Sequence, residues 1–213
     1  MGICYIVGAG DFFGSFTPSK DDLVIAADGG YLSLLTKGIR CDVLLGDMDS
    51  LSERSTDSNP LSHLDGAKVE ILKFPVEKDE TDTHLAYLEG VRRGYTTFRV
   101  LGGVGGREDH TFANYSLLLY GKNASHSITL VGNGCESFVI KNESVTLRGK
   151  RGGDLSVFAF GGVARGVCIL GAKYEAKSLT LTPDFPLGVS NSFLDGEVTV
   201  SVSEGALLIM RSV

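Results

Sequence analysis

The chain has 213 residues, of which 43% are hydrophobic and 22% charged, and its formal net charge is -6 at pH 7. This length can bury the core of one large domain or of two small ones. The acidic balance argues against a broad surface for a nucleic-acid backbone, so we expect no nucleic-acid partner.

Neither the cysteines nor the apolar runs indicate a secreted or membrane protein. The cysteines are far apart and form no CxxC pair, which argues against a zinc site or a disulfide framework and favours reduced thiols. No run approaches the ~18 apolar residues of a membrane span, and the N-terminus lacks the pattern of a signal peptide. We therefore expect a cytoplasmic location and no membrane partner.

The first apolar run, Ile3 to Val7, is followed by a glycine turn, Gly8-Ala9-Gly10-Asp11-Phe12-Phe13-Gly14. A glycine turn after a first strand suggests a dinucleotide fingerprint, but the third glycine comes one residue late for GxGxxG. The spacing therefore does not favour a nicotinamide cofactor.

Strand and helix patterns then alternate for about 120 residues. Strands are predicted at 23–27, 43–45, 69–74 and 98–101, and helical spacing occurs at 31–37, 82–93 and 109–120. Gly38 is a candidate C-cap and Thr81 a candidate N-cap, while the polar stretch 51–66 could hold a helix and a loop. This alternation predicts an α/β domain with a mostly parallel, doubly wound sheet and helices on both faces.

Beyond Gly121 the helical period disappears, and short apolar runs are separated by turn residues. The runs lie at 127–131, 137–140, 144–147, 155–160, 167–170, 179–181, 197–202 and 206–210. Such spacing is typical of an antiparallel β-sandwich or barrel. We predict an α/β domain at 1–123 and an all-β domain at 124–213.

Four acidic or glycine-rich stretches follow apolar runs of the first domain directly. They are Asp28-Gly29-Gly30, Gly46-Asp47-Met48-Asp49-Ser50, Glu77-Lys78-Asp79-Glu80-Thr81-Asp82 and Gly102-Gly103-Val104-Gly105-Gly106-Arg107-Glu108-Asp109-His110. Any one alone is more often a solvated turn, but ligands of open parallel sheets bind outside the carboxyl ends of the strands. Four together favour a binding site there.

The residue types in these stretches suit a polyphosphate with Mg²⁺, a hard cation that prefers carboxylate and phosphate oxygens. Asp47, Asp49 and Asp82 are the candidate ligands, with Asp28 nearby. Lys78 and Arg107 would supply positive charge, and Gly105 and Gly106 would let backbone N–H groups approach a phosphate. His110 could be catalytic or structural.

These stretches, with Asn114, resemble the signature blocks of the thiamine pyrophosphokinase family. The resemblance extends to Gly171-Ala172-Lys173-Tyr174 and Val189-Ser190-Asn191-Ser192, and so spans nearly the whole chain. It implies an α/β domain followed by a β-sandwich, a homodimer, and transfer of the pyrophosphoryl group of ATP to the hydroxyl of thiamine, with AMP as the second product.

The resemblance also implies roles for particular residues, and it implies active sites shared between the two protomers. The catalytic residues would be Asp47, Asp49, Asp82 and Arg107, of which the three aspartates bind Mg²⁺. The ATP-binding residues would be Asp28, Gly29, Lys78, Asp79, Gly105, Gly106, Arg107, Asp109 and His110. The thiamine-binding residues would be Tyr174, Ser190 and Asn191, with Tyr174 where some relatives carry Trp.

Two further functions stay open from the residues alone. A Mg²⁺-dependent phosphatase also uses a DxD pair at a strand end, but that pair normally follows the first strand, and the glycine-arginine stretch would be unexplained. A non-catalytic nucleotide sensor would keep the glycines and basic groups but has little need for so many converging acids.

Overall fold

The computed structural model describes residues 2–47, 69–75 and 77–213. Asp49 and the polar stretch 51–66 therefore lie outside the described residues. The chain divides into two compact units, one of Met1–Leu117 with Leu130–Gly132 and one of Leu118–Thr129 with Asn133–Val213. We describe each unit by itself, and a domain boundary after residue 123 stays a prediction.

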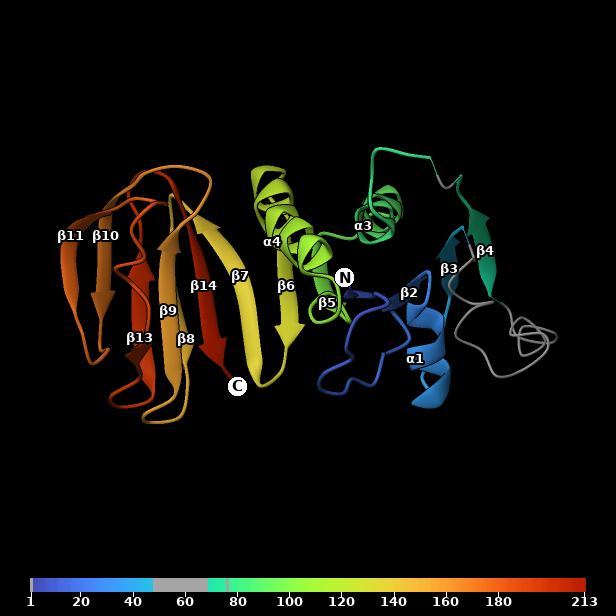
Figure 1. The fold of residues 1–213 in the computed structure, drawn as a ribbon. Coiled ribbons are helices and arrows are strands. Elements are labelled where there is room, and N and C mark those ends of the chain that lie inside the picture. Colours follow the sequence, from blue (N-terminus) through green and yellow to red (C-terminus); the bar gives the residue numbers. More distant parts are fainter. Residues whose placement is uncertain (1, 48–68, 76) are drawn as a thin grey trace. The chain divides into compact units, whose positions relative to one another are not determined.

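The first unit contains a parallel sheet of the five strands β1 (Cys4–Val7), β2 (Leu23–Ala27), β3 (Val43–Gly46), β4 (Glu70–Lys73) and β5 (Thr97–Leu101). Their order is β5-β1-β2-β3-β4, and every neighbouring pair among them is parallel (Figure 1). β1, β2 and β3 are buried along their whole length, which explains their continuous apolar runs.

Helices cover both faces of this sheet, as predicted. In β1, Tyr5 and Val7 belong to a buried cluster that includes Tyr31 and Leu34 of α1 (Gly30–Thr36). On the opposite face, a Cβ added to Gly90 of α3 (Asp82–Arg92) would lie only 2.8 Å from Cys4 Sγ. Since successive side chains of a strand alternate between faces, α1 and α3 lie on opposite sides and the sheet is doubly wound. The third described helix is α4 (Glu108–Asn123).

The predicted helix ends are confirmed by their backbone geometry. Thr81 Oγ1 accepts a hydrogen bond from the His84 backbone N–H at 3.2 Å, which satisfies one of the first amide groups of α3. Beyond α1, Gly38 has φ 62°, and its N–H donates to Leu35 O at 3.1 Å. This left-handed residue ends the helix at little steric cost because glycine has no Cβ.

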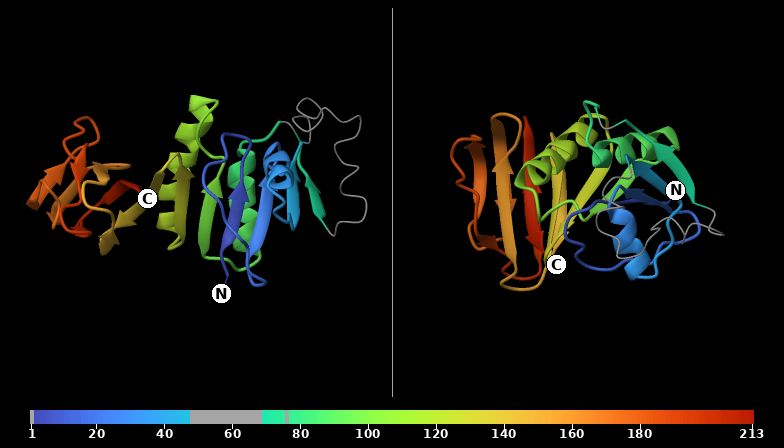
Figure 2. Two further views of the ribbon diagram at one scale, coloured as in Figure 1. Left: turned by 90° about the horizontal axis from the view of Figure 1, so that it is seen from below. Right: turned by 45° about the vertical axis from the view of Figure 1, so that its right-hand side comes forward.

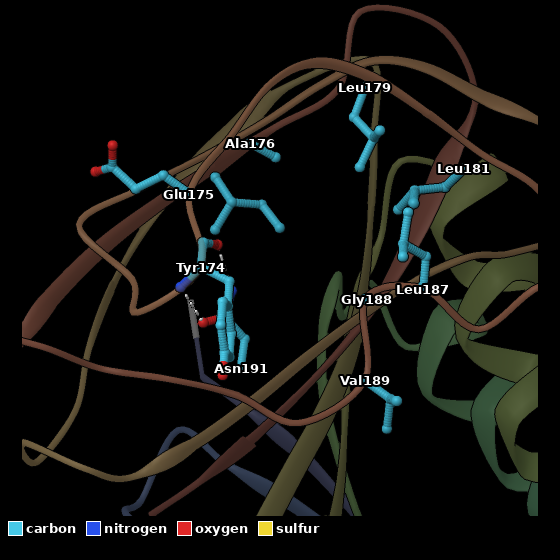
Figure 3. A pocket seen from close by; sticks show the side chains of 10 residues that line it. Tyr174, Glu175, Ala176, Leu179, Leu181, Leu187, Gly188, Val189 and Asn191 are labelled. Carbon is cyan, nitrogen blue, oxygen red and sulfur yellow. Dashed lines mark hydrogen bonds between the residues drawn. The ribbon is translucent and has the colours of Figure 1, made fainter.

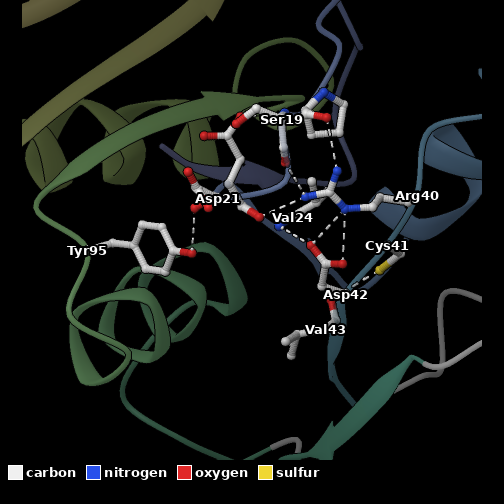
Figure 4. A network of polar contacts seen from close by, with 10 residues as sticks. Ser19, Asp21, Val24, Arg40, Cys41, Asp42, Val43 and Tyr95 are labelled. Atoms are coloured by element: carbon white, nitrogen blue, oxygen red, sulfur yellow. Dashed lines mark hydrogen bonds and ion pairs between the residues drawn. The ribbon is translucent and has the colours of Figure 1, made fainter. Parts of the chain in front are cut away.

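Carboxylates at the amino ends of the strands are bonded to backbone and to arginine (Figure 4). Asp22 Oδ1 accepts from the Ile3 N–H at 2.7 Å, and this hydrogen bond is the main reason why the pKa of Asp22 is lowered. Asp42 Oδ2 accepts from the Val24 N–H at 2.8 Å, while its Oδ1 receives Arg40 Nε at 3.1 Å. These aspartates have a structural role.

The second unit is a sandwich of antiparallel sheets (Figures 1 and 2). One sheet has the neighbouring strands β12-β9-β14-β7, and the other has the strand order β11-β10-β13-β8. Their facing residues form one core, with Val157 and Leu207 from the first sheet and Val167 and Val198 from the second. The strands of the sandwich are β7 (Cys135–Lys141), β8 (Ser144–Arg148), β9 (Asp154–Ala159), β10 (Ala164–Leu170), β11 (Ala176–Leu181), β12 (Asn191–Ser192), β13 (Glu197–Ser201) and β14 (Ala206–Ser212). The residues of β6 (Ser127–Gly132) are divided between the two units.

The strand β12 was not predicted from the sequence. This strand has two residues, too few for a period of two to appear in the sequence, and it exists because Asn191 and Ser192 pair with β9. No helix among the described residues has the length and apolar character needed to cross a membrane.

Candidate active site

The carboxyl ends of β1 and β5 are held together by backbone contacts through glycine. Gly8 N–H donates to Leu101 O at 2.8 Å, and Gly10 N–H donates to Gly102 O at 2.9 Å. A Cβ at Gly8 would lie 2.7 Å from Gly102 O, closer than real Cβ atoms approach. The glycine turn after β1 therefore permits a close approach of two loops, a role that differs from the dinucleotide fingerprint considered above.

Asp28 and the end of β3 lie side by side at the same edge. The Asp28 N–H donates to Leu45 O at 2.7 Å, and Asp28 has the left-handed φ of 49°. Gly46 has φ 141°, and a Cβ added there would come within 3.1 Å of Asp28 Cβ. Asp47 is half-buried immediately after Gly46, so the turns that carry Asp28 and Asp47 are adjacent.

Asp28 differs from the aspartates at the amino edge because one of its oxygens lacks a donor. Its Oδ1 is buried and has no hydrogen-bond partner among the described residues. An unpaired buried carboxylate oxygen is costly, and a bound cation would relieve that cost. No group of three or more His, Cys, Asp or Glu side chains among the described residues is arranged to hold a metal ion. The oxygens of Asp28 and Asp47 nevertheless suit a hard cation such as Mg²⁺.

The first turn of α3 reaches the same edge from the other side. The Cβ position of Gly8 is 3.6 Å from Thr83 Oγ1, which places the start of α3 next to the end of β1. Lys78 Nζ lies 2.7 Å from Asp82 Oδ1, in an ion pair whose side chains are 12% and 27% exposed. Lys78 thus supplies fixed positive charge beside Asp82, whereas Asp79 is exposed to solvent.

The glycine-rich loop after β5 depends on left-handed backbone conformations. Gly102, Gly105 and Gly106 have φ 62°, 80° and 70°. A Cβ at Gly105 would lie 2.8 Å from Asp11 Cγ. Within the following helix, buried Asn114 donates from Nδ2 to Gly103 O at 2.7 Å. Asp11 and Asn114 therefore shape this loop, and for Asp11 this role was not predicted from the sequence.

Arg107 and Asp109 form an exposed pair at the start of α4. Arg107 Nη2 lies 2.6 Å from Asp109 Oδ2, and the side chains are 72% and 64% exposed. The hydrogen bond from Arg107 is the main reason why the pKa of Asp109 is lowered to about 2. The His110 backbone N–H donates to Asp109 Oδ1 at 3.0 Å. Asp109 thus orients Arg107 and the first turn of the helix.

In the second unit, Tyr174 and Asn191 line a largely apolar cavity of about 400 Å³ (Figure 3). Its other walls include Ile169, Leu179, Leu181, Leu187 and Val189. Tyr174 is 61% exposed. The Ser190 N–H, on a residue with φ 61°, donates to Ser156 Oγ at 3.2 Å.

The Asn191 amide is bonded to the backbone of Tyr174 on both sides. Asn191 Oδ1 accepts from the Tyr174 N–H at 2.9 Å and from the Ser192 N–H at 2.9 Å, and its Nδ2 donates to Tyr174 O at 2.7 Å. Asn191 is 6% exposed. It therefore fixes the Tyr174 backbone at the cavity wall.

Acidic and glycine-rich loops at the carboxyl edge of a parallel sheet are typical of α/β enzyme domains that bind phosphate-bearing ligands, and the first unit has this form. Residues 17–130 match the family model of the thiamin pyrophosphokinase catalytic domain, and residues 143–207 match that of the vitamin B1 binding domain. The chain belongs to the thiamin pyrophosphokinase family, and it is thus a transferase of the kinase class that acts on thiamine.

Individual relatives agree with this assignment. The chain is 26% identical to thiamine pyrophosphokinase of Bacillus subtilis over 198 residues, which is 89% of this chain and 87% of the relative. The crystal structure of a thiamin pyrophosphokinase from Geobacillus thermodenitrificans is 27% identical, with a TM-score of 0.82 and coverage of 99% and 97%. A thiamin pyrophosphokinase from Candida albicans shares the fold at 13% identity, with a TM-score of 0.76 and coverage of 100% and 89%.

Proposed function

We propose that the protein transfers the pyrophosphoryl group of ATP to the hydroxyl of thiamine, giving thiamine diphosphate and AMP, with Mg²⁺ as cofactor. The observation that carries this proposal is that a catalytic-domain model and a vitamin B1 binding model match successive parts of one chain. Neither a phosphatase nor a nucleotide sensor would explain the match to the vitamin B1 binding domain.

We assign ATP and Mg²⁺ to the carboxyl edge of the parallel sheet. Asp47, Asp49 and Asp82 would hold the ion, and the unpaired buried oxygen of Asp28 supports adding this residue to the set. Bound Mg²⁺ would neutralise phosphate charge and help to orient the polyphosphate. The role of Asp49, which lies outside the described residues, rests on sequence alone.

The chain's own groups would supply the remaining charge and positioning. Lys78 pairs with the partly buried Asp82, and Arg107 pairs with Asp109 at the exposed start of α4, so both cations would be available to phosphates bound at these loops. The positive φ values of Gly105 and Gly106 keep side chains away from a phosphate at this loop. Positioning and charge neutralisation account for most catalysis of phosphoryl transfer.

We assign thiamine to the cavity that Tyr174 lines. Thiamine carries a cationic aromatic ring, and the exposed Tyr174 ring offers an aromatic face for it. Asn191 would act by holding the Tyr174 backbone, and Ser190 would supply a neutral polar group. An apolar cavity with a few polar groups is the usual form of a small-molecule site.

Analysis of the nucleotide product tests the reaction. Purified protein is incubated with ATP and Mg²⁺, with and without thiamine, and the nucleotides are separated. AMP formed only with thiamine supports pyrophosphoryl transfer. ADP would indicate transfer of a single phosphoryl group, and phosphate release without thiamine would indicate a phosphatase, so either result refutes the proposal.

We further propose a cytoplasmic homodimer in which each active site combines the acids of one protomer with Tyr174 of the other. Asp47→Asn and Tyr174→Ala should each be nearly inactive alone. After subunit exchange at equal amounts, one site in each heterodimer is intact, so roughly a quarter of wild-type activity should return for random pairing. No recovery, with exchange confirmed independently, would place both residues in one protomer's site.

A further inference from the structure

We infer that the second unit carries an additional anion site, specific for a phosphate-bearing ligand, in the cavity between the β8–β9 turn and the end of β14. The cavity has a volume of about 590 Å³, and four basic side chains line it: Arg148, Lys150, Arg151 and Arg211. No acidic side chain is among its lining residues in the described part of the chain. This concentration is unusual in a protein with a net charge of -6.

Two of the basic groups are partly neutralised and two are not. Arg148 Nε lies 2.8 Å from Glu197 Oε1, and Arg211 Nη2 lies 2.9 Å from Glu136 Oε2. Lys150 and Arg151 have no ion-pair partner among the described residues. The two bonded glutamates leave Lys150 and Arg151 as unpaired cations at the cavity, and two such cations suit an anionic phosphate group.

The turn that presents Lys150 and Arg151 is built rigidly. Gly153 N–H donates to Lys150 O at 2.9 Å, and Gly152 has φ 78°, as the third position of a tight turn requires. Gly152 N–H donates to Phe193 O at 2.8 Å, and Phe193 N–H donates to Gly153 O at 3.1 Å.

The residues before the turn are fixed as well. Gly149 N–H donates to Gly196 O at 2.9 Å, and a Cβ at Gly149 would lie 2.7 Å from the Phe193 ring. Arg211 Nη1 donates to Arg148 O at 2.8 Å and so links β14 to this segment. The basic groups are thus displayed on a preorganised backbone, which lowers the entropy lost when an anion binds.

Inorganic pyrophosphate is the probe, used with the full chain in metal-free buffer. We follow the backbone amide resonances of Gly152 and Gly153 by NMR, because these report on the turn and not on the catalytic edge. Saturable shifts are expected, and Lys150→Ala/Arg151→Ala should weaken binding by about tenfold or more because two charge-assisted contacts are lost. Arg165→Ala is the matched control, since Arg165 is an exposed arginine of the same unit paired with Glu204.

Three results would overturn the inference. They are the absence of saturable shifts, equal affinity in the double variant and the wild type, and the same shifts with sodium chloride at equal ionic strength. Thiamine-dependent AMP formation by the same variants is measured separately. AMP formation tests the proposed function, whereas the amide shifts test the anion site, so the two proposals can fail independently.

Discussion

Replacing Asp28 by Asn tests whether the unpaired carboxylate belongs to the active site. Asn tolerates the left-handed φ of 49° as well as Asp does, so the backbone should not change. The substitution removes a charge whose buried Oδ1 has no donor among the described residues. Since such groups destabilise by about 1–3 kcal/mol, and the amide remains polar, we expect a gain in unfolding free energy of about 1 kcal/mol.

Asp42→Asn is the matched control from the opposite edge of the same sheet. Its carboxylate accepts from Val24 N–H and Arg40 Nε, and hydrogen bonds to charged groups contribute about 1.5–3 kcal/mol. The Arg40 pair is 38% and 34% exposed, so solvent screening reduces its share to roughly 0.2–1 kcal/mol. The control should therefore lose about 1–2 kcal/mol of unfolding free energy and keep its turnover.

The two variants are compared by thermal melting without ligands and by AMP formation at saturating ATP, thiamine and Mg²⁺. Asp28→Asn should melt about 2–4 °C higher than the wild type and lose roughly 100-fold in turnover, a loss typical of removing one electrostatic group from an active site. Asp42→Asn should melt lower with normal turnover. If Asp28→Asn is destabilised as much as the control and remains fully active, its carboxylate is structural.

Three further predictions concern single residues. Gly46→Ala should lower the unfolding free energy by about 1–3 kcal/mol, because a residue with a Cβ is strained at φ 141° and the new Cβ would press on Asp28. An unchanged denaturant midpoint would contradict this. Asn191→Ala should raise KM for thiamine more than it lowers kcat if the side chain acts by holding Tyr174, while equal effects on ATP and thiamine would argue for general unfolding. Burial lowers the pKa of His84 below its usual 6.5, so the unfolded state binds the proton more readily, and unfolding free energy should fall as pH drops below 6.5. In His84→Gln the unfolding free energy should depend less on pH in this range. If the variant and the wild type lose stability equally as pH falls, His84 is not the cause.

The order of strands and helices could be predicted from the sequence because each element carries its own local pattern. The apolar runs of β1, β2 and β3 are continuous because both faces of a parallel sheet are covered. Thr81 and Gly38 could be identified as caps because a capping hydroxyl and a left-handed glycine act within one turn of the chain. Acidic and glycine-rich loops after these strands likewise indicated one edge of the sheet.

Contacts between distant residues were decided only by the tertiary structure. The sequence shows Asp22, Asp28 and Asp42 as similar loop acids. The backbone N–H groups of Ile3 and Val24 bond Asp22 and Asp42, whereas Asp28 Oδ1 has no such donor among the described residues. Asn191 likewise reads as a binding residue, but its amide holds Tyr174, 17 positions away. Local propensity determines which elements form, whereas the bonding of a polar side chain depends on which segments the packed core brings beside it.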